Sequence, residues 1–139
     1  METNTKLASF IDIYHSNEDV LTAMCGRMVQ DIKYNEIEEE IIFSFSDCEV
    51  IFYHSQDCCE QVVVEDINGD WNDLIGTMLL VAEERTNDEP EQGCTPLEED
   101  LWTFYTFRSL KGSVDVRWHG TSNGYYSMDV NINVRNKTL

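Results

Sequence analysis

The sequence predicts a mainly β protein of the α+β class, with about seven to nine antiparallel strands and two short helices. These strands are expected to form a curved sheet, an open barrel or a sandwich. Short runs of aromatic and β-branched residues recur along the chain, and many alternate between apolar and polar side chains, as half-buried strands do. Lys111-Gly112 and Asn123-Gly124 separate such runs, and Asn-Gly in particular tolerates the positive φ of a tight hairpin turn.

The clearest strands are predicted near the C-terminus. Residues 101–108 are rich in aromatic and β-branched types, and in residues 113–119 the two valines and Trp118 alternate with charged side chains. Residues 126–134 alternate again after the Asn-Gly pair. We expect these three runs to form a meander within one sheet, which would have one apolar and one polar face.

The rest of the chain predicts further strands and two short helices. Ser16 or Asn17 is expected to cap a helix that stops at Gly26, and Asp70 is expected to cap a helical turn closed by Gly76. Consecutive strands are expected to be neighbours in the sheet. These strands are predicted at residues 28–34, 37–45, 50–54, 61–67 and 77–83.

The chain of 139 residues predicts a single domain, 1–139. Residues 1–16 are polar and are expected to be loosely held. Residues 84–100 contain both prolines among Asn, Asp, Glu, Gln and Gly, which predicts an acidic surface loop. We expect neither a membrane span nor a secretory signal, because no apolar run is long enough and the N-terminus lacks the required pattern. The expected location is a cytoplasm, where the five cysteines would stay reduced.

A net charge of −18 is the most unusual property of the composition. Between Tyr34 and Asp100 there are twenty acidic residues and one base, Arg85. This charge argues against direct binding to nucleic acid, because phosphate contacts need clustered Lys and Arg. Such a field instead favours a basic partner, although solubility alone is the alternative explanation. The predicted partner-binding residues are Glu38, Glu39, Glu40, Glu83, Glu84, Asp88, Glu89, Glu91, Glu98, Glu99 and Asp100.

Several sequence blocks between about Leu21 and Val134 resemble a family of short phage and prophage proteins that is known only as a domain of unknown function. The blocks are Tyr53-His-Ser-Gln-Asp-Cys-Cys-Glu60, Glu65-Asp-Ile-x-Gly-Asp70, Asp73-Leu-Ile-Gly76, Trp102-Thr-Phe-Tyr105 and Arg117-Trp-x-Gly-x-Ser-Asn-Gly-Tyr-Tyr-Ser127. The resemblance implies a viral origin. It brings no established activity and no catalytic residues.

His54, Cys58 and Cys59 offer an imidazole and two thiols, which are the ligands that zinc prefers. Adjacent cysteines on an extended chain point to opposite faces, so both could bind one ion only at a sharp bend. A fourth ligand would have to come from Cys48, Cys94 or His119. The default expectation is therefore a packed corner without metal, and a catalytic Cys-His pair is disfavoured because no oxyanion-hole motif is present.

Two other stretches have features of ligand sites. Residues 66–73 begin like a calcium loop, but Trp71 stands where the loop glycine should be, so a turn with a capped helix is preferred. The second candidate ligand-binding set is Arg117, His119, Asn123 and Tyr125. Arg could pair with a phosphate and Tyr could stack on a base, which suits a nucleotide second messenger. An ordinary solvated sheet face is the alternative.

The leading hypothesis is a non-enzymatic phage protein, similar in action to an anti-CRISPR inhibitor, that needs no cofactor. It would act in the host cytoplasm by offering carboxylates where a host protein, such as a CRISPR effector, binds nucleic-acid phosphates. A sponge for a nucleotide messenger and a small metal-binding protein are the alternatives. A structural or regulatory phage protein whose acidity serves solubility is the third possibility.

Overall fold

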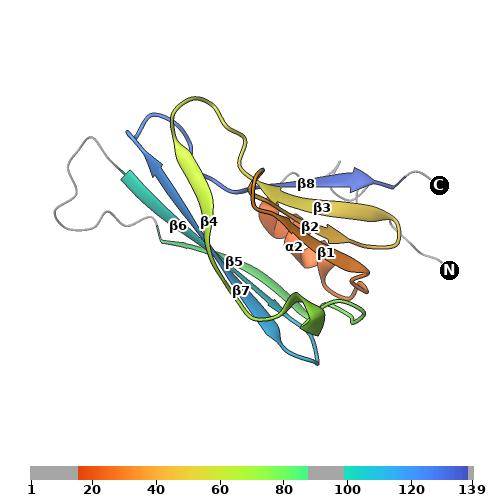
Figure 1. Cartoon of the computed structure of the whole chain (residues 1–139). Helices are drawn as coiled ribbons and strands as arrows, with labels where there is room; N and C mark the ends of the chain where they lie inside the picture. The colour runs from red at the N-terminus through yellow and green to blue at the C-terminus, as the bar shows by residue number, and fades with distance from the viewer. Residues whose placement is uncertain (1–15, 88–98, 138–139) are drawn as a thin grey trace.

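A computed structural model describes residues 16–87 and 99–137 of the chain. These residues form two antiparallel sheets of four strands each, packed face to face (Figure 1). The first sheet has the strand order β1-β2-β3-β8 and the second the order β4-β7-β6-β5. The predicted mainly β fold is thus confirmed, and among the architectures expected from the sequence it is the sandwich.

The strands of the first sheet are β1 (Asp31–Asn35), β2 (Glu40–Ser44), β3 (Cys48–Tyr53) and β8 (Asn131–Asn136). The strands of the second sheet are β4 (Gln61–Asn68), β5 (Val81–Asn87), β6 (Glu99–Arg108) and β7 (Ser113–Ser122). The two sheets also touch through an isolated antiparallel bridge between Met28 and Met78, which lie just before β1 and β5.

An α-helix, α2 (Asn17–Met24), contacts β5 and β8, which are edge strands of the two sheets. It begins after Ser16, whose side-chain oxygen accepts a hydrogen bond from the backbone N–H of Asp19 at 3.1 Å. The buried residues of the helix are Val20, Leu21 and Met24. The predicted helix is confirmed, with Ser16 as its cap. Within the described residues, no helix has the length and apolar character needed to cross a membrane.

The second predicted helix is a single 3-10 turn, η1 (Trp71–Asp73). The Asp70 side chain accepts a hydrogen bond from the backbone N–H of Asn72 at 2.9 Å, and Gly69 before it has a φ of 125°. Any side chain at Gly69 would meet the backbone carbonyl of Ser113 at 2.5 Å, so this turn requires glycine. Asp70 thus caps the turn, as the sequence predicted.

The core lies where the two sheets meet, and aromatic rings dominate its centre. Phe43 and Phe52 come from the first sheet and Tyr105 and Phe107 from the second. The ring centroids of Phe43 and Phe107 are 4.7 Å apart, and those of Phe52 and Tyr105 are 5.1 Å apart in an edge-on arrangement. Such ring pairs add to the free energy gained by burial, so this cluster helps to hold the two sheets together.

The predicted meander is correct for two of its three strands. β6 and β7 pair antiparallel, and the valines and Trp118 of β7 are buried while the side chains between them face outward. The third strand is wrong in its position, because β8 begins at Asn131 and pairs with β3 in the other sheet. A strand has two edges for pairing, and β7 already pairs with β4 and β6.

Two further expectations change in the structure. β3 and β4 follow each other in the chain but lie in different sheets, so the rule of consecutive neighbours fails there. The predicted loop at 84–100 is also too long, because β5 extends to Asn87 and β6 starts at Glu99. The remainder of that loop, and all of the N-terminal segment 1–16 except Ser16, lie outside the described residues.

Candidate functional site

A groove of about 690 Å³ lies between the turn that joins β1 to β2 and the segment that joins β3 to β4. One wall is formed by residues 38–40, at the turn from β1 into β2, and the other by most of the segment 54–63, which leads from β3 into β4. The predicted acidic triplet and the predicted His/Cys corner therefore face the same space. The sequence placed them in separate candidate sites, because it does not show that a turn of one sheet meets the entry to the other.

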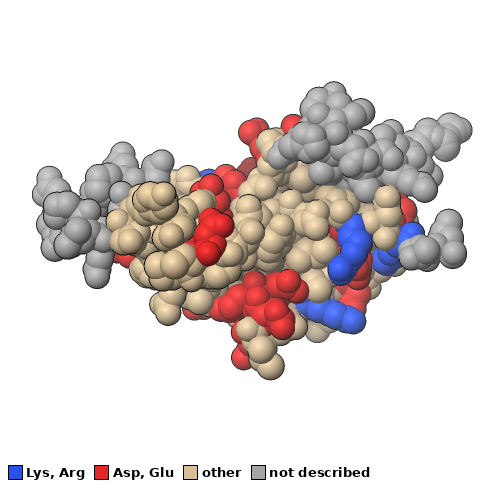
Figure 2. Space-filling model, turned by 90° about the horizontal axis from the view of Figure 1, so that it is seen from above, with Lys and Arg blue, Asp and Glu red and all other residues tan. Residues whose placement is uncertain are grey.

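Glu38 and Glu40 carry the available negative charge of the groove. Glu38 is exposed and Glu40 is half-buried. Among the described residues, neither carboxylate has a hydrogen bond or an ion pair. Figure 2 shows Asp and Glu side chains gathered in groups on one face, while the Lys and Arg side chains lie mostly at one end of it. Both carboxylates are thus free to meet a cation.

Glu39 has a structural role instead. Its Oε2 accepts a hydrogen bond from the Tyr34 hydroxyl at 2.9 Å, and its Oε1 accepts one from the backbone N–H of Val64 at 3.1 Å. Because Val64 belongs to β4, Glu39 joins the two sheets. Burial and then this bond to Glu39 raise the pKa of Tyr34 to about 12. The carboxylate of Glu39 is therefore not available to a partner.

Glu60 and His54 form the buried floor of the groove. Glu60 is 3% exposed, and its Oε2 lies 2.7 Å from His54 Nε2. His54 Nδ1 lies 2.7 Å from the carbonyl oxygen of Asp129. Both ring nitrogens of His54 thus lie within hydrogen-bonding distance of an oxygen atom. The backbone N–H of Asp57, followed by His54, lowers the pKa of Glu60 to about 2.

Cys58 and Cys59 stand exposed beside this floor. The chain bends at both residues, and their sulfur atoms are 3.0 Å apart rather than on opposite faces. A hydrogen bond with Cys58 is the largest cause that raises the pKa of the Cys59 thiol. The same interaction with Cys58 raises the pKa of Tyr126, which places the loop after β7 next to the thiols.

The zinc hypothesis gains no assembled site from this geometry. His54 would have to give up one of its two hydrogen bonds to coordinate an ion. Cys48 is buried in the core, His119 lies on another face, and Cys94 is outside the described residues. In residues 16–87 and 99–137, no group of three or more His, Cys, Asp or Glu side chains is placed to hold a metal. Zinc binding stays an untested alternative to the metal-free corner that the sequence favoured.

The outer face of the second sheet carries Arg117 and His119, side by side as the alternation predicted. The imidazole of His119 stacks on the Trp102 ring at 4.1 Å between centroids, and the guanidinium carbon of Arg117 lies 5.3 Å from the same ring's centroid. Arg85 lies in the same way over Phe104, at 5.6 Å. Both arginines line a small pocket of about 160 Å³.

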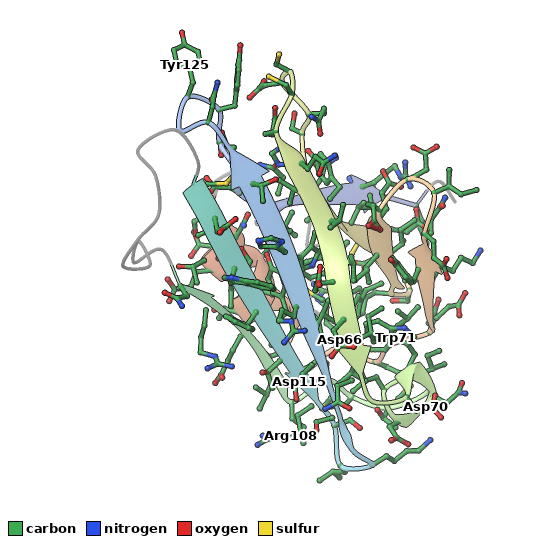
Figure 3. The ribbon with its side chains drawn as sticks, turned by 60° about the vertical axis from the view of Figure 1, so that its left-hand side comes forward. Asp66, Asp70, Trp71, Arg108, Asp115 and Tyr125 are labelled. Carbon is green, nitrogen blue, oxygen red and sulfur yellow. The ribbon has the colours of Figure 1, made fainter. Side chains whose placement is uncertain are left out.

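Trp102, Phe104 and Arg85 were not identified as site residues from the sequence. The alternation of side chains along residues 101–108 could have placed Trp102 and Phe104 on the same outer face. Of the four predicted ligand-binding residues, Arg117 lines the pocket, and His119, Asn123 and Tyr125 do not. Tyr125 is 82% exposed and rests edge-on against Tyr126. Figure 3 shows it at the tip of the loop after β7, whereas Asp115 lies toward the other end of that strand. The four predicted ligand-binding residues therefore do not form one site.

The other acidic residues predicted to contact a partner do not share one role in the structure. Glu83 is exposed on β5. Glu84 accepts hydrogen bonds from the Tyr105 hydroxyl and from Asn17 Nδ2, and Asp100 lies 3.2 Å from His119 Nε2. For Glu99 the structure describes only its place at the start of β6. The predicted residues outside the described part of the chain are Asp88, Glu89, Glu91 and Glu98.

The fold and the groove define a β-sandwich protein with an acidic surface site. Comparison with known families matches residues 22–132 to a domain of unknown function, DUF7448, and the chain belongs to this family. The match confirms that a family of unknown function covers most of the chain, as the resemblance implied. No curated protein and no solved structure matches it.

Proposed function

We propose that this protein is a non-enzymatic binding protein whose groove receives a positively charged segment of a partner. The observation that carries the proposal is the pair Glu38 and Glu40. Both residues line a groove of about 690 Å³, and their carboxylates have no partner among the described residues of a chain of net charge −18. Lys or Arg side chains of a partner would meet these carboxylates, and the field of the whole molecule would steer the encounter.

More specifically, we propose that the protein is a phage counter-defence protein that acts in the host cytoplasm. The carboxylates would stand where a nucleic-acid-handling host protein, such as a CRISPR effector, binds phosphate groups. The viral origin comes from the resemblance, and the mode of action from the charge. A mimic of this kind competes with nucleic acid for its partner, so bound target DNA would block its binding.

The test uses fluorescence anisotropy with a labelled Lys/Arg-rich peptide as the probe. Glu38→Gln/Glu40→Gln should weaken binding by about tenfold, which corresponds to about 1.4 kcal/mol. The control Glu18→Gln/Asp19→Asn removes the same charge from α2 and should leave the affinity within about twofold. Binding by the wild type should weaken steeply with NaCl. Equal losses in both double variants would assign the effect to net charge alone and contradict the groove.

The counter-defence role needs its own assay. A guide-loaded CRISPR effector is incubated with the protein, and binding of target DNA is measured by gel shift. Inhibition that is lost in Glu38→Gln/Glu40→Gln and prevented by pre-bound DNA supports the mimic. A protein that binds the basic peptide but never competes with DNA would keep the binding function and reject the counter-defence role.

A second candidate function rests on the outer face of the second sheet. Arg85 and Arg117 lie over aromatic rings beside the same small pocket, and among the described residues neither guanidinium has an ion pair. A phosphate could be bound by these guanidiniums while a base stacks nearby. A thermal-shift screen with cyclic nucleotides tests this. A rise in Tm that Arg117→Ala abolishes would favour the messenger sponge.

A further inference from the structure

The groove contains two thiols that the proposed function does not use. The sulfur atoms of Cys58 and Cys59 are 3.0 Å apart, and both side chains are exposed. A disulfide bond is about 2.05 Å long, so a small movement separates this pair from bonding distance. The bend at the two residues brings together side chains that an extended chain would send to opposite faces.

Polar groups hold this bend on both sides of the Cys58 residue. Its backbone N–H donates to Glu60 Oε1 at 2.9 Å, and its carbonyl accepts a hydrogen bond from Gln56 Nε2 at 3.3 Å. The backbone N–H of Asp57 donates to Glu60 Oε2 at 2.8 Å. Glu60 is itself fixed by His54, whose side chain is 5% exposed. The thiols are thus presented by a preorganised corner rather than by a free loop.

We propose that Cys58 and Cys59 form a reversible redox site, at which a small-molecule disulfide converts the two thiols into a vicinal disulfide. One thiolate attacks the reagent, its S–S bond breaks, and a thiolate leaves, so that a mixed disulfide forms. The neighbouring thiolate then attacks the protein sulfur of that mixed disulfide and releases the second reagent thiolate. The protein loses two electrons and two protons, and the reagent becomes two thiols.

The geometry makes this bond a reversible modification rather than a structural crosslink. Adjacent α-carbons are about 3.8 Å apart across a trans peptide. Most disulfides join α-carbons about 4.4–6.8 Å apart, so the vicinal bond is strained. Strained and exposed disulfides are more easily reduced than structural ones. The site therefore responds to the thiol–disulfide balance of its surroundings, and it does so whether or not the groove binds a basic partner.

The test exposes the full-length reduced protein to glutathione buffers of increasing oxidised fraction. Free thiols are then alkylated, and the protein is cut with a glutamate-specific protease. Peptide 50–60 contains Cys58 and Cys59 and no other cysteine. We expect this peptide to lose two hydrogens and to escape alkylation, and a reductant should reverse both changes. A peptide that carries glutathione adducts, or that stays fully alkylated throughout, would overturn the proposal.

Variants separate the thiol pair from its scaffold. In Cys58→Ser and Cys59→Ser the remaining thiol should accumulate a glutathione adduct and never lose two hydrogens. Glu60→Gln, assayed where it is still folded, should lower the fraction of vicinal disulfide several-fold at a fixed buffer ratio, and Glu65→Gln on the exposed part of β4 should not. Gln56→Ala tests the same corner by a substitution at an exposed residue, because it removes the hydrogen bond to the Cys58 carbonyl. Unchanged oxidation in both corner variants would contradict preorganisation by this corner.

Discussion

At the scale of single residues, the hydrogen-bond donors around each carboxylate determine its role. Glu38 and Glu40 face the groove without partners among the described residues, whereas Glu39 between them binds Tyr34 and Val64. Glu39 also has a φ of 52°, a left-handed conformation that is uncommon for residues other than glycine. Three identical adjacent residues thus divide into two that are free to bind and one that holds the fold.

Replacing Glu39 should therefore cost stability, and replacing Glu38 should not. Glu39→Ala removes two hydrogen bonds to a charged group and leaves the Val64 N–H without its acceptor, which should lower the free energy of unfolding by about 2 kcal/mol. Glu38→Ala, at an exposed site, should change it by less than about 0.5 kcal/mol. Urea denaturation measures both. Equal midpoints for the two variants would contradict the inter-sheet role of Glu39.

Glu60 predicts a pH dependence of stability. Its folded-state pKa is about 2 and its ordinary value is 4.5, so the ionised carboxylate stabilises the fold above pH 4.5, and this contribution is lost as the pH falls toward about 2. Glu60→Gln should thus lower the urea midpoint at pH 7, and the difference from wild type should shrink between pH 4.5 and 2. For Glu65→Gln we expect no such trend. A difference that is independent of pH would contradict the assignment.

At the scale of elements, the sequence predicts the starts of helical segments better than it predicts which strands pair. Helix α2 and turn η1 begin where their capping side chains predict, because a cap is formed by residues within one turn of each other. β8 was assigned to the wrong sheet, because its alternating pattern fits either sheet equally. Its Ile132 and Val134 pair with Phe52 and Val50 of β3, and no neighbour in sequence indicates this.

Ser16→Ala tests the helix cap. Loss of the hydrogen bond to Asp19 should lower the free energy of unfolding by about 1 kcal/mol. Because α2 contacts both β5 and β8, the loss should appear in the global unfolding transition and not only in local fraying. Chemical denaturation followed by circular dichroism provides the measurement, with Ser113→Ala on the exposed start of β7 as the control. Identical midpoints for Ser16→Ala and wild type would show that the cap adds nothing.

At the scale of the whole molecule, a net charge of −18 produces self-repulsion that opposes compact folding. The sandwich nonetheless brings the acidic turn at residues 38–40 against the start of β4, where it lines the groove. Binding of a basic partner would relieve part of this repulsion. Salt should therefore have opposite effects on stability and on binding.

Screening by salt should raise the Tm of the free protein. Between 10 mM and about 0.3 M NaCl we expect a rise of about 5 °C, because carboxylates farther apart than the Debye length no longer repel one another. Choline chloride at the same ionic strengths should give the same rise, which separates screening from binding of a specific cation. A Tm that falls with added salt would mean that attractive ion pairs, such as Arg27 with Asp47, outweigh the repulsion.

The sequence by itself determined the features that depend on residues close together in the chain. Alternation in residues 113–119 set which side chains of β7 are buried, and Ser16 and Asp70 set where the helical segments begin, because these interactions span a few residues. The acidity that motivates the proposed function is likewise a property of composition alone.

The tertiary structure alone decided which segments meet. It assigned β8 to β3, brought residues 38–40 against the segment 54–63, and separated Tyr125 from Arg117. Sheet pairing depends on which strand edges are still free, and the state of a carboxylate or thiol depends on donors supplied from distant positions. A local sequence pattern predicts neither the strand pairing nor the state of these side chains, because both depend on contacts that form only when the two sheets pack together.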